Sequence, residues 1–468
     1  MKNLIKGCVV LLFASSLGCS SDDAPEMYVP IADNGEELSG GINGTVFNNS
    51  AEAFGFAFKN LSDDEQTDFG VGNSFFRQTW VSSPSSTTAR DGLGPFYNAT
   101  ACASCHFKDG RGRPPLNSQE LGRGLLLRLS TAGHDNNGNP FLDPIYGGQL
   151  QDNALLGLTV KGNFTISFET IVETLSDGTS VELQKPTYNF TNLGYGNMAG
   201  GLMVSPRIAN QMAGLGLLEA VSEQDLLGFA DASDSNGDGI SGRPNYVYDF
   251  EANAQRLGRF GWKANEPSIK QQVAAAFSGD IGITSSIFPN ENCPPGVNCD
   301  DIPNGGSPEI SDVSLRRVTL YSSTLSVPAR RNYKSPNVVA GKRLFESMNC
   351  IGCHKPKMQT GDTHPIIALR NQTIRPYTDL LLHDMGPGLA DNAPSFLATG
   401  SEWRTQPLWG IGLIETVNGH TRLLHDGRAR NVQEAILWHG GEAESAKNQY
   451  KQLSAKQRSD LLEFIQSL

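Results

Sequence analysis

The chain has 468 residues with 38% apolar residues, 51 glycines and 25 prolines, which excludes a single small module, a disordered chain and a coiled coil. Its 37 Lys and Arg residues against 49 Asp and Glu give a net charge of −12 without a basic run, which argues against binding nucleic acid. This length predicts about two or three domains.

The N-terminal residues are typical of an export signal. Residues 1–18 contain two lysines followed by an apolar run, and Leu17-Gly18-Cys19 resembles the lipobox of bacterial lipoproteins. We predict that Cys19 is lipidated and that residues 19–45 form a tether; an ordinary signal peptide cut later is the alternative. The protein is therefore expected in the cell envelope, anchored by lipid to the outer membrane. No later apolar run approaches the ~20 residues of a spanning helix, so no other membrane contact is expected.

Two segments, 102–106 and 350–354, have the spacing Cys-x-x-Cys-His. Two thiols at this spacing can add to the two vinyl groups of a haem, and the adjacent histidine is placed to bind the iron. A zinc site would need the two cysteine pairs within ~15 to 20 residues of each other, and far more sequence separates them here. Two covalently attached haem c groups are therefore predicted. The attaching and iron-binding residues are Cys102, Cys105, His106, Cys350, Cys353 and His354.

Helices are predicted around each motif. Residues 62–65 form a capping-box pattern ahead of the first motif, and Gly341 and Phe345 share a helical face ahead of the second. A helix at 309–325 leads to an interdomain connection, and a helix with Ser454 as N-cap closes the chain. A glycine and an aromatic residue on one face allow close helix approach, as in a cytochrome c fold. The prediction is a mainly α fold with two cytochrome c-like haem domains.

An internal repeat relates the two halves. The segment 260–273 recurs at 423–436, so that Trp262 corresponds to His425, and a Gly-x-Gly segment precedes each copy. Each half therefore contains a haem motif, a glycine-rich turn, and a Trp or His ahead of a helix.

The first half is longer because it contains inserts. Residues 164–168 and 181–185 flank Asp177-Gly178 and are predicted to form a β-hairpin. The predicted domains are an N-terminal haem c domain at 46–330, with this hairpin and long loops, and a C-terminal cytochrome c domain at 331–468.

A loop in the second insert resembles a calcium site. Asp234, Asn236 and Asp238, with the carbonyl of Ile240, match the first positions of a calcium-binding loop. Asn245 stands where a bidentate Glu belongs, so a turn without metal is the alternative. Ca²⁺ is therefore a candidate cofactor.

Cys293 and Cys299 lie in a loop rich in Pro, Gly and Asn. In an exported protein, a structural disulfide between them is the preferred interpretation.

Several motifs together resemble the bacterial di-haem peroxidase superfamily and, within it, the di-haem oxidoreductase family described as peroxidases or thiol oxidoreductases. The resemblance covers most of residues 46–468. The motifs are Gly258-Arg-Phe-Gly-Trp-Lys-Ala264, His383-Asp-Met-Gly386, Leu424-His-Asp-Gly-Arg428 and Leu437-Trp-His-Gly-Gly441.

This resemblance implies a second iron ligand for the C-terminal haem. The superfamily places that ligand, commonly Met or Tyr, fourteen residues after the His of the His-Asp-Gly motif. The residue here is His439, which can also bind iron. A structural role for His439 and iron binding by Met385 are the alternatives, and His425 is expected to orient a carboxylate or propionate.

The first haem has no equivalent second ligand, because the corresponding residue is Ala276. His134 could swing in as a ligand, although a solvated loop histidine is the simpler interpretation. The resemblance places Trp262 between the haems as an electron relay, with a packed core Trp as the alternative. The family's peroxidases carry a Glu where this chain has Gly282, and Asp280 is the nearest acid that could protonate a leaving oxygen.

The predicted function is a di-haem oxidoreductase that reduces hydrogen peroxide at the N-terminal haem with electrons from the C-terminal haem. Oxidation of thiols or protein side chains, and electron transfer without catalysis, are the alternatives. The expected partners are a small electron-donor protein or a quinol-linked cytochrome, with hydrogen peroxide or a thiol as substrate.

Overall fold

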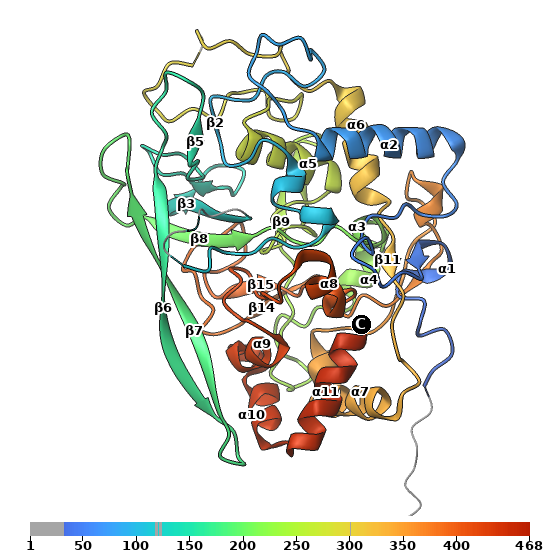
Figure 1. Ribbon diagram of the computed structural model, residues 1–468. Helices are drawn as coiled ribbons and strands as arrows, with labels where there is room; N and C mark the ends of the chain where they lie inside the picture. The colour runs from blue at the N-terminus through green and yellow to red at the C-terminus, as the bar shows by residue number, and fades with distance from the viewer. Residues whose placement is uncertain (1–31, 118–119, 121–123, 300) are drawn as a thin grey trace, which may run out of the picture.

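The computed structural model describes residues 32–117, 120, 124–299 and 301–468 (Figure 1). The predicted signal peptide, Cys19 and part of the tether lie outside these residues. The α-helices are α1 (Gly41–Gly44), α2 (Asp63–Arg77), α3 (Leu215–Glu219), α4 (Glu223–Leu227), α5 (Ile269–Ala276), α6 (Asp312–Ser323), α7 (Pro336–Ser347), α8 (Ile414–Asn418), α9 (Val432–Trp438), α10 (Glu444–Gln452) and α11 (Ala455–Ser467), and a π-helix, η3 (Phe277–Ile281), follows α5. The strands are β1 (Thr45–Val46), β2 (Phe96–Tyr97), β3 (Leu125–His134), β4 (Pro140–Phe141), β5 (Asn153–Ala154), β6 (Asn163–Thr174), β7 (Ser180–Thr191), β8 (Met203–Ile208), β9 (Tyr246–Asp249), β10 (Ala254–Leu257), β11 (Val327–Pro328), β12 (Met358–Gln359), β13 (Thr373–Ile374), β14 (Leu382–Asp384) and β15 (Glu402–Arg404).

The prediction of a mainly α fold is wrong. The structure is 27% helical and 19% strand, and its strands form many small sheets, such as β4-β3-β8 and the pair β6-β7. The longest strands, β3, β6 and β7, all belong to the first-half insert. These segments form strands because their side chains alternate between two faces. The helices around the motifs are too few to make the fold mainly α.

The helices predicted near each motif are present. The capping box at Ser62 begins α2, and Ser454 begins α11 with a capping box of its own. The segment predicted as a helix at 309–325 forms the shorter α6.

Two pairs of helices cross at glycines. Helix α2 packs on α6, and α7 packs on α11. A Cβ on Gly72 would lie 2.2 Å from the carbonyl oxygen of Arg317, and one on Gly341 would lie 2.0 Å from that of Asp460. Only glycine allows these backbones to approach so closely. In both pairs a glycine therefore brings the two helix backbones into close contact.

The predicted hairpin is present and is longer than expected, with β6 and β7 paired from Asn163–Thr191 to Thr174–Ser180. It runs beside α9 and α10 of the second half (Figure 1). At its tip, Leu175 is buried in the core of that half, while Asp177 pairs with Arg458 and Glu173 with Lys451, both at 2.6 Å. The insert of the first half thus binds the second half.

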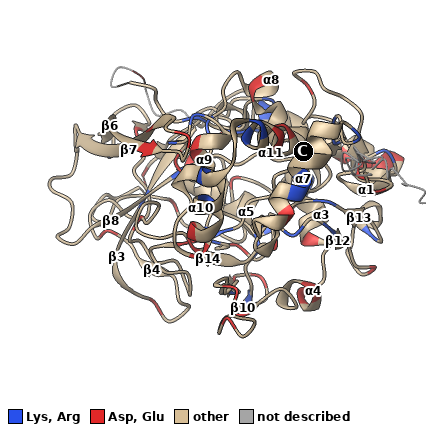
Figure 2. Cartoon of the chain, turned by 90° about the horizontal axis from the view of Figure 1, so that it is seen from below, with Lys and Arg blue, Asp and Glu red and all other residues tan. Residues whose placement is uncertain are grey.

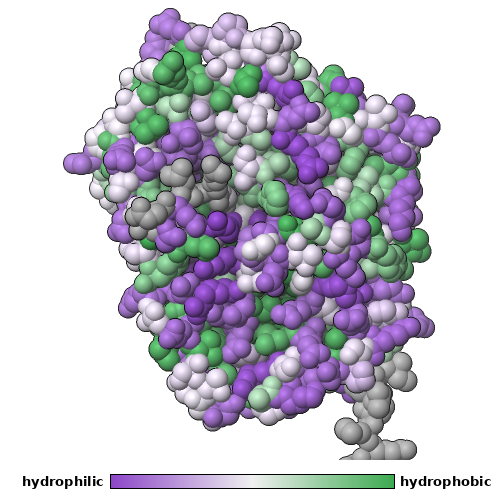
Figure 3. Space-filling view, viewed as in Figure 1, coloured by the Kyte–Doolittle hydropathy of each residue, from purple (hydrophilic) through white to green (hydrophobic). Residues whose placement is uncertain are grey.

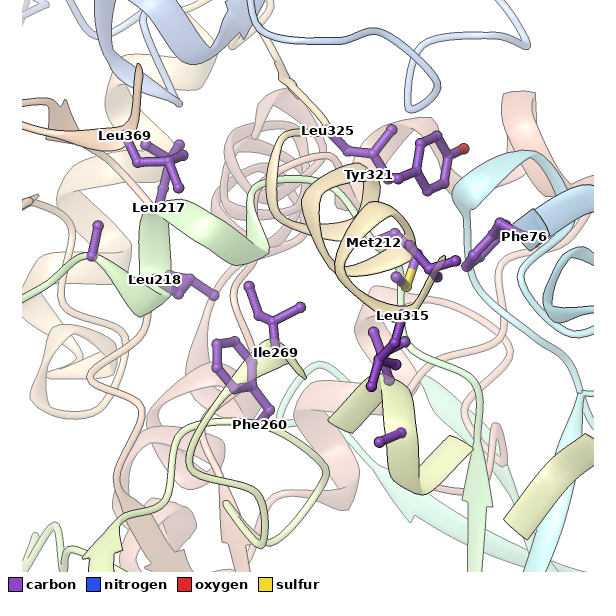
Figure 4. Packing of buried hydrophobic residues seen from close by; sticks show 14 of the residues in the cluster. Phe76, Met212, Leu217, Leu218, Phe260, Ile269, Leu315, Tyr321, Leu325 and Leu369 are labelled. Carbon is purple, nitrogen blue, oxygen red and sulfur yellow. The ribbon is translucent and has the colours of Figure 1, made fainter. Parts of the chain in front are cut away.

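The two large hydrophobic clusters each draw on both halves. The first contains Phe76 and Met212 together with Leu369 of the second half (Figure 4). Trp409 of the second half belongs to the same cluster. The second cluster contains Trp262 of the first half. The two predicted domains, which meet at residues 330 and 331, therefore do not have separate hydrophobic cores.

The surface mixes polar and apolar residues. Lys, Arg, Asp and Glu are distributed over helices and loops (Figure 2), and the face seen in Figure 3 is largely hydrophilic with small apolar patches. Among the described residues, no helix is both long and apolar enough to cross a membrane.

Candidate haem sites

The first Cys-x-x-Cys-His segment borders a cavity in the first half. This first cavity has about 1260 Å³ of empty space, part of it open to solvent. Cys102, Cys105 and His106 line it, together with Trp262 and Asp280. The structure therefore brings together all the residues that the sequence predicts for the first haem.

The second segment borders a similar cavity, with about 1650 Å³ of empty space that is also partly open. Cys350, Cys353 and His354 line it. His439 and Met385, the two candidates for the second iron ligand, line it as well. His439 is the C-cap residue of α9, so the end of this helix lies at the cavity that His439 lines.

The three histidines predicted to bind iron share one hydrogen-bonding pattern, in which Nδ1 lies against a main-chain carbonyl. Because a carbonyl only accepts, Nδ1 carries the hydrogen and Nε2 keeps the lone pair that a metal needs. Burial lowers the pKa of each ring, that of His354 to about 4, so the rings are neutral. The pairs are His106 with Asn210 at 2.7 Å, His354 with Tyr377 at 2.8 Å, and His439 with Ala435 at 2.6 Å.

The cysteines of both motifs are partly buried free thiols. Burial raises the pKa of Cys102, Cys105 and Cys350 to about 12, so they do not present the thiolates that bind metals directly. Within the described residues, no group of three or more His, Cys, Asp or Glu side chains is placed to hold a metal ion. A cysteine pair, one metal-binding histidine and a large cavity at each site fit a haem attached through thioethers.

The two cavities are lined by equivalent positions of the repeat, at a constant spacing of 163 residues. Ile269, Gln272, Val273 and Ala276 of α5 line the first cavity, and Val432, Ala435, Ile436 and His439 line the second. The methyl group of Ala276 therefore occupies the position that an imidazole occupies in the second cavity.

One further side chain of the first cavity's lining could bind iron. This residue is Met212, which lines the cavity two residues after Asn210. The carbonyl of Asn210 accepts the hydrogen bond of His106, so Met212 lies in the segment that contacts His106. Its counterpart in the repeat is Leu408. His134 is exposed at the end of β3 and is not among the residues that line the cavity.

Asp280 is held in η3, one turn beyond Ala276. Its Oδ1 accepts a hydrogen bond of 2.9 Å from Nε2 of Gln149, and its backbone carbonyl accepts bonds from Asn98 and Ala99. Burial raises its pKa, and the Arg128 guanidinium opposes that rise. A π-helical turn often marks a functional site, and this one carries the acid that the sequence predicts.

Trp262 lines both cavities. Its Nε1 donates a 2.8 Å hydrogen bond to the carbonyl of Ile208, and the Arg111 guanidinium lies 5.1 Å from its ring centroid. The ring meets His425 edge-on at 6.4 Å, and His425 stacks on Trp403 with centroids 3.9 Å apart. An aromatic contact therefore joins the two cavities, where the sequence predicts a relay.

Two other histidines, His383 and His425, also line the second cavity, and Nδ1 of His383 lies 3.3 Å from Sγ of the motif residue Cys353. His383 lies between Asp379, 2.9 Å from Nε2, and Glu442, 2.7 Å from Nδ1. Nδ1 of His425 donates to the carbonyl of Pro206, and its Nε2 is buried without a hydrogen-bond partner. An unpartnered Nε2 fits the predicted role of His425 toward a carboxylate or propionate.

Sequence reasoning missed Arg128 and Gln149 beside Asp280, and Arg111 and Trp403 between the cavities. The first two lie in the first-half insert, which has no counterpart in the repeat. A usable signal for Arg128 was its position as the single Lys or Arg in β3, directly between Leu127 and Leu129.

The loop predicted to bind calcium borders the second cavity, which Asp238 and Ile240 line, whereas the cysteine loop lines neither cavity. Side chains of Asp234, Asn236 and Asp238 accept hydrogen bonds from backbone N–H groups of their own loop. Cys293 and Cys299 are joined by a disulfide.

Residues 34–468 match the family model described as "Di-haem oxidoreductase, putative peroxidase". The match covers nearly the whole chain, so the chain belongs to the di-haem oxidoreductase family. No curated protein matches the chain. Family membership makes the protein an oxidoreductase with haem cofactors and agrees with the two cavities.

Proposed function

We propose that the protein reduces hydrogen peroxide in the first cavity with electrons delivered through the second. The observation that carries this proposal is Ala276, which leaves open in the first cavity the position that His439 fills in the second. An open iron position is what peroxide chemistry requires, whereas an iron with two protein ligands suits electron transfer.

The reaction consumes one hydrogen peroxide, two electrons and two protons and yields two water molecules. Haems attached through the two cysteine pairs would supply the redox-active iron for this reaction. The carboxyl of Asp280 donates a proton to the oxygen that leaves, and burial raises its pKa above the usual value of an aspartate. The Trp262 side chain provides the contact between the cavities.

The second site is proposed to bind iron through His354 and His439, and both haems are proposed to be covalently attached. Intact-protein mass spectrometry after acid extraction checks the attachment, since thioether-linked haem stays with the chain.

A reciprocal pair of variants tests the function. Ala276→His places a ligand in the first cavity, and we expect it to abolish cyanide binding there and peroxide turnover. His439→Ala should open the second site to cyanide. Electron paramagnetic resonance of the resting and half-reduced protein identifies which haem changes. A wild-type protein with only low-spin signals in both states, and no cyanide binding, would contradict the proposal and favour electron transfer without catalysis.

The protein is further proposed to be exported and lipid-anchored through Cys19, and to receive electrons from a small donor protein or a quinol-linked cytochrome. Incorporation of labelled palmitate that Cys19→Ser abolishes is the expected result. Calcium in the 234–240 loop stays a prediction, which calorimetry with Ca²⁺ can check.

A further inference from the structure

A cation from the inserted sheet reaches the first cavity. Arg128 lies on β3, which pairs with β8 so that Arg128 stands opposite Ser205. Side chains alternate along a strand, and Leu126 and Arg128 line the cavity while Leu125, Leu127 and Leu129 are buried behind it. Strand β3 therefore directs one charged side chain, that of Arg128, into the wall of the first cavity, where Arg207 of β8 and Asp280 of η3 are further charged lining residues.

Arg128 lies beside the proposed acid. It forms an isolated β-bridge with Gln149, whose Nε2 holds the Oδ1 of Asp280 at 2.9 Å. A side chain at Gly279 would begin 3.6 Å from Nη1 of Arg128. The guanidinium thus packs against the turn of η3 that carries Asp280.

Arg128 also interacts electrostatically with Asp280. Two partly buried acids, Asp280 and Glu266, interact electrostatically with Arg128, and Glu266 also interacts with Arg207. Burial raises the pKa of both acids, and Arg128 opposes both shifts. Arg207 also lines the first cavity, and it donates hydrogen bonds to the side chains of Ser205 and Asn265.

The pair of acid and cation is specific to the first cavity. The residue four positions after His439, where Asp280 would correspond, is Ala443, and it lines the second cavity. Strand β3 belongs to the insert, so no arginine equivalent to Arg128 exists in the repeat.

The geometry points to Arg128 as a further catalytic residue of the first cavity, which binds the peroxide oxygens and offsets the negative charge on the leaving oxygen while Asp280 supplies the proton. This role rests on the proposed peroxide reduction. A charged donor aimed at the atom where negative charge develops is effective in a cavity shielded from water.

Fluoride and cyanide binding to the ferric holoprotein tests this role apart from turnover. Fluoride requires an open iron and a hydrogen-bond donor. We expect Arg128→Gln to weaken fluoride binding by on the order of tenfold to a hundredfold, and to slow peroxide reduction by on the order of a hundredfold or more. Arg128→Lys should recover part of both. Arg256→Gln, which removes an exposed arginine of β10, should change neither.

The outcomes separate this inference from the proposed function. If wild type binds neither anion, the first site is closed and the proposed function fails. If wild type binds fluoride and Arg128→Gln binds it equally well, the function stands and the role of Arg128 is wrong. An Arg128→Gln protein with an altered resting spectrum and unchanged fluoride affinity would also overturn it, because the arginine would then bind the cofactor's propionate.

Discussion

One repeat position distinguishes the two cavities, because His439 stands in the second where Ala276 stands in the first. His439 and His354 each hold Nδ1 against a main-chain carbonyl, and burial lowers the pKa of both rings. As an axial pair on haem iron, Met with His raises the reduction potential relative to two histidines.

His439→Met should therefore raise the potential of the second haem, by on the order of a hundred millivolts within the ~0.8 V range that axial ligands cover. A spectroelectrochemical titration measures it, with the first haem as internal reference. An unchanged potential in the variant would show that Met385 or another group, and not His439, binds this iron.

A buried lysine makes stability depend on pH. Lys161 is fully buried, and its Nζ donates to the carbonyl of Tyr146 at 3.0 Å. Burial lowers its pKa to about 7. In the unfolded chain a lysine titrates near ~10.4. Between these two values the unfolded state binds more protons, so the contribution of Lys161 to stability increases as pH rises from about 7 toward 10.

Lys161→Met removes this dependence. In wild type, the contribution of Lys161 to the free energy of unfolding should grow by about 2 to 3 kcal/mol from pH 7 to pH 9, because each pH unit in this window is worth about 1.4 kcal/mol. The variant lacks this gain, so its stability relative to wild type should fall by the same amount over this range. Denaturant unfolding of both proteins at the two pH values measures the difference. Lys334→Met, at an exposed position, serves as the control. A difference between Lys161→Met and wild type that is constant with pH would contradict the expected titration.

At the scale of elements, α2 offers two glycines with opposite roles. Gly72 faces α6, and a Cβ there would lie 2.2 Å from the Arg317 carbonyl oxygen, while a Cβ on Gly70 meets nothing within 4 Å. Gly72 is required where the two helices cross, whereas Gly70 only lowers the intrinsic stability of helix α2.

Gly72→Ala should therefore destabilise the protein by about 1 to 3 kcal/mol, because the helices must separate. Gly70→Ala should stabilise it by about 0.5 to 1 kcal/mol. Free energies of unfolding measure both on the same helix. Equal effects of the two substitutions would show that α2 and α6 do not cross at Gly72.

Local patterns allowed the elements around the motifs to be predicted. The cap at Ser62, the pair Gly341 and Phe345, and the hairpin turn at Asp177 each depend on residues close in sequence. The mainly α prediction was wrong because the long strand pair β3 and β8 joins distant segments. The bond from Gln149 to Asp280 spans 131 residues, so no local pattern indicates it.

At the scale of the molecule, the two halves are held together around Trp262. The hairpin fixes one side through Leu175, Asp177 and Glu173, and both hydrophobic clusters cross the boundary. Trp262 lines both cavities, and the Arg111 guanidinium packs on its ring. The repeat placed Trp262 opposite His425, and the structure brings these two rings into contact. Packing of this kind would hold the two proposed haem sites at a fixed distance, as the proposed electron transfer between them requires.

Trp262→Leu should therefore separate the transfer of electrons from the chemistry of each site. We expect cyanide binding and the spectra of both haems to be retained, while reduction of the first haem by electrons entering at the second becomes slower. Rapid mixing of the half-reduced protein with peroxide measures this rate. Trp80→Phe, in the first hydrophobic cluster and away from the junction, is the matched control. If Trp262→Leu transfers electrons at the wild-type rate, the tryptophan is only a packed core residue, and the path between the sites must run through other groups at the junction.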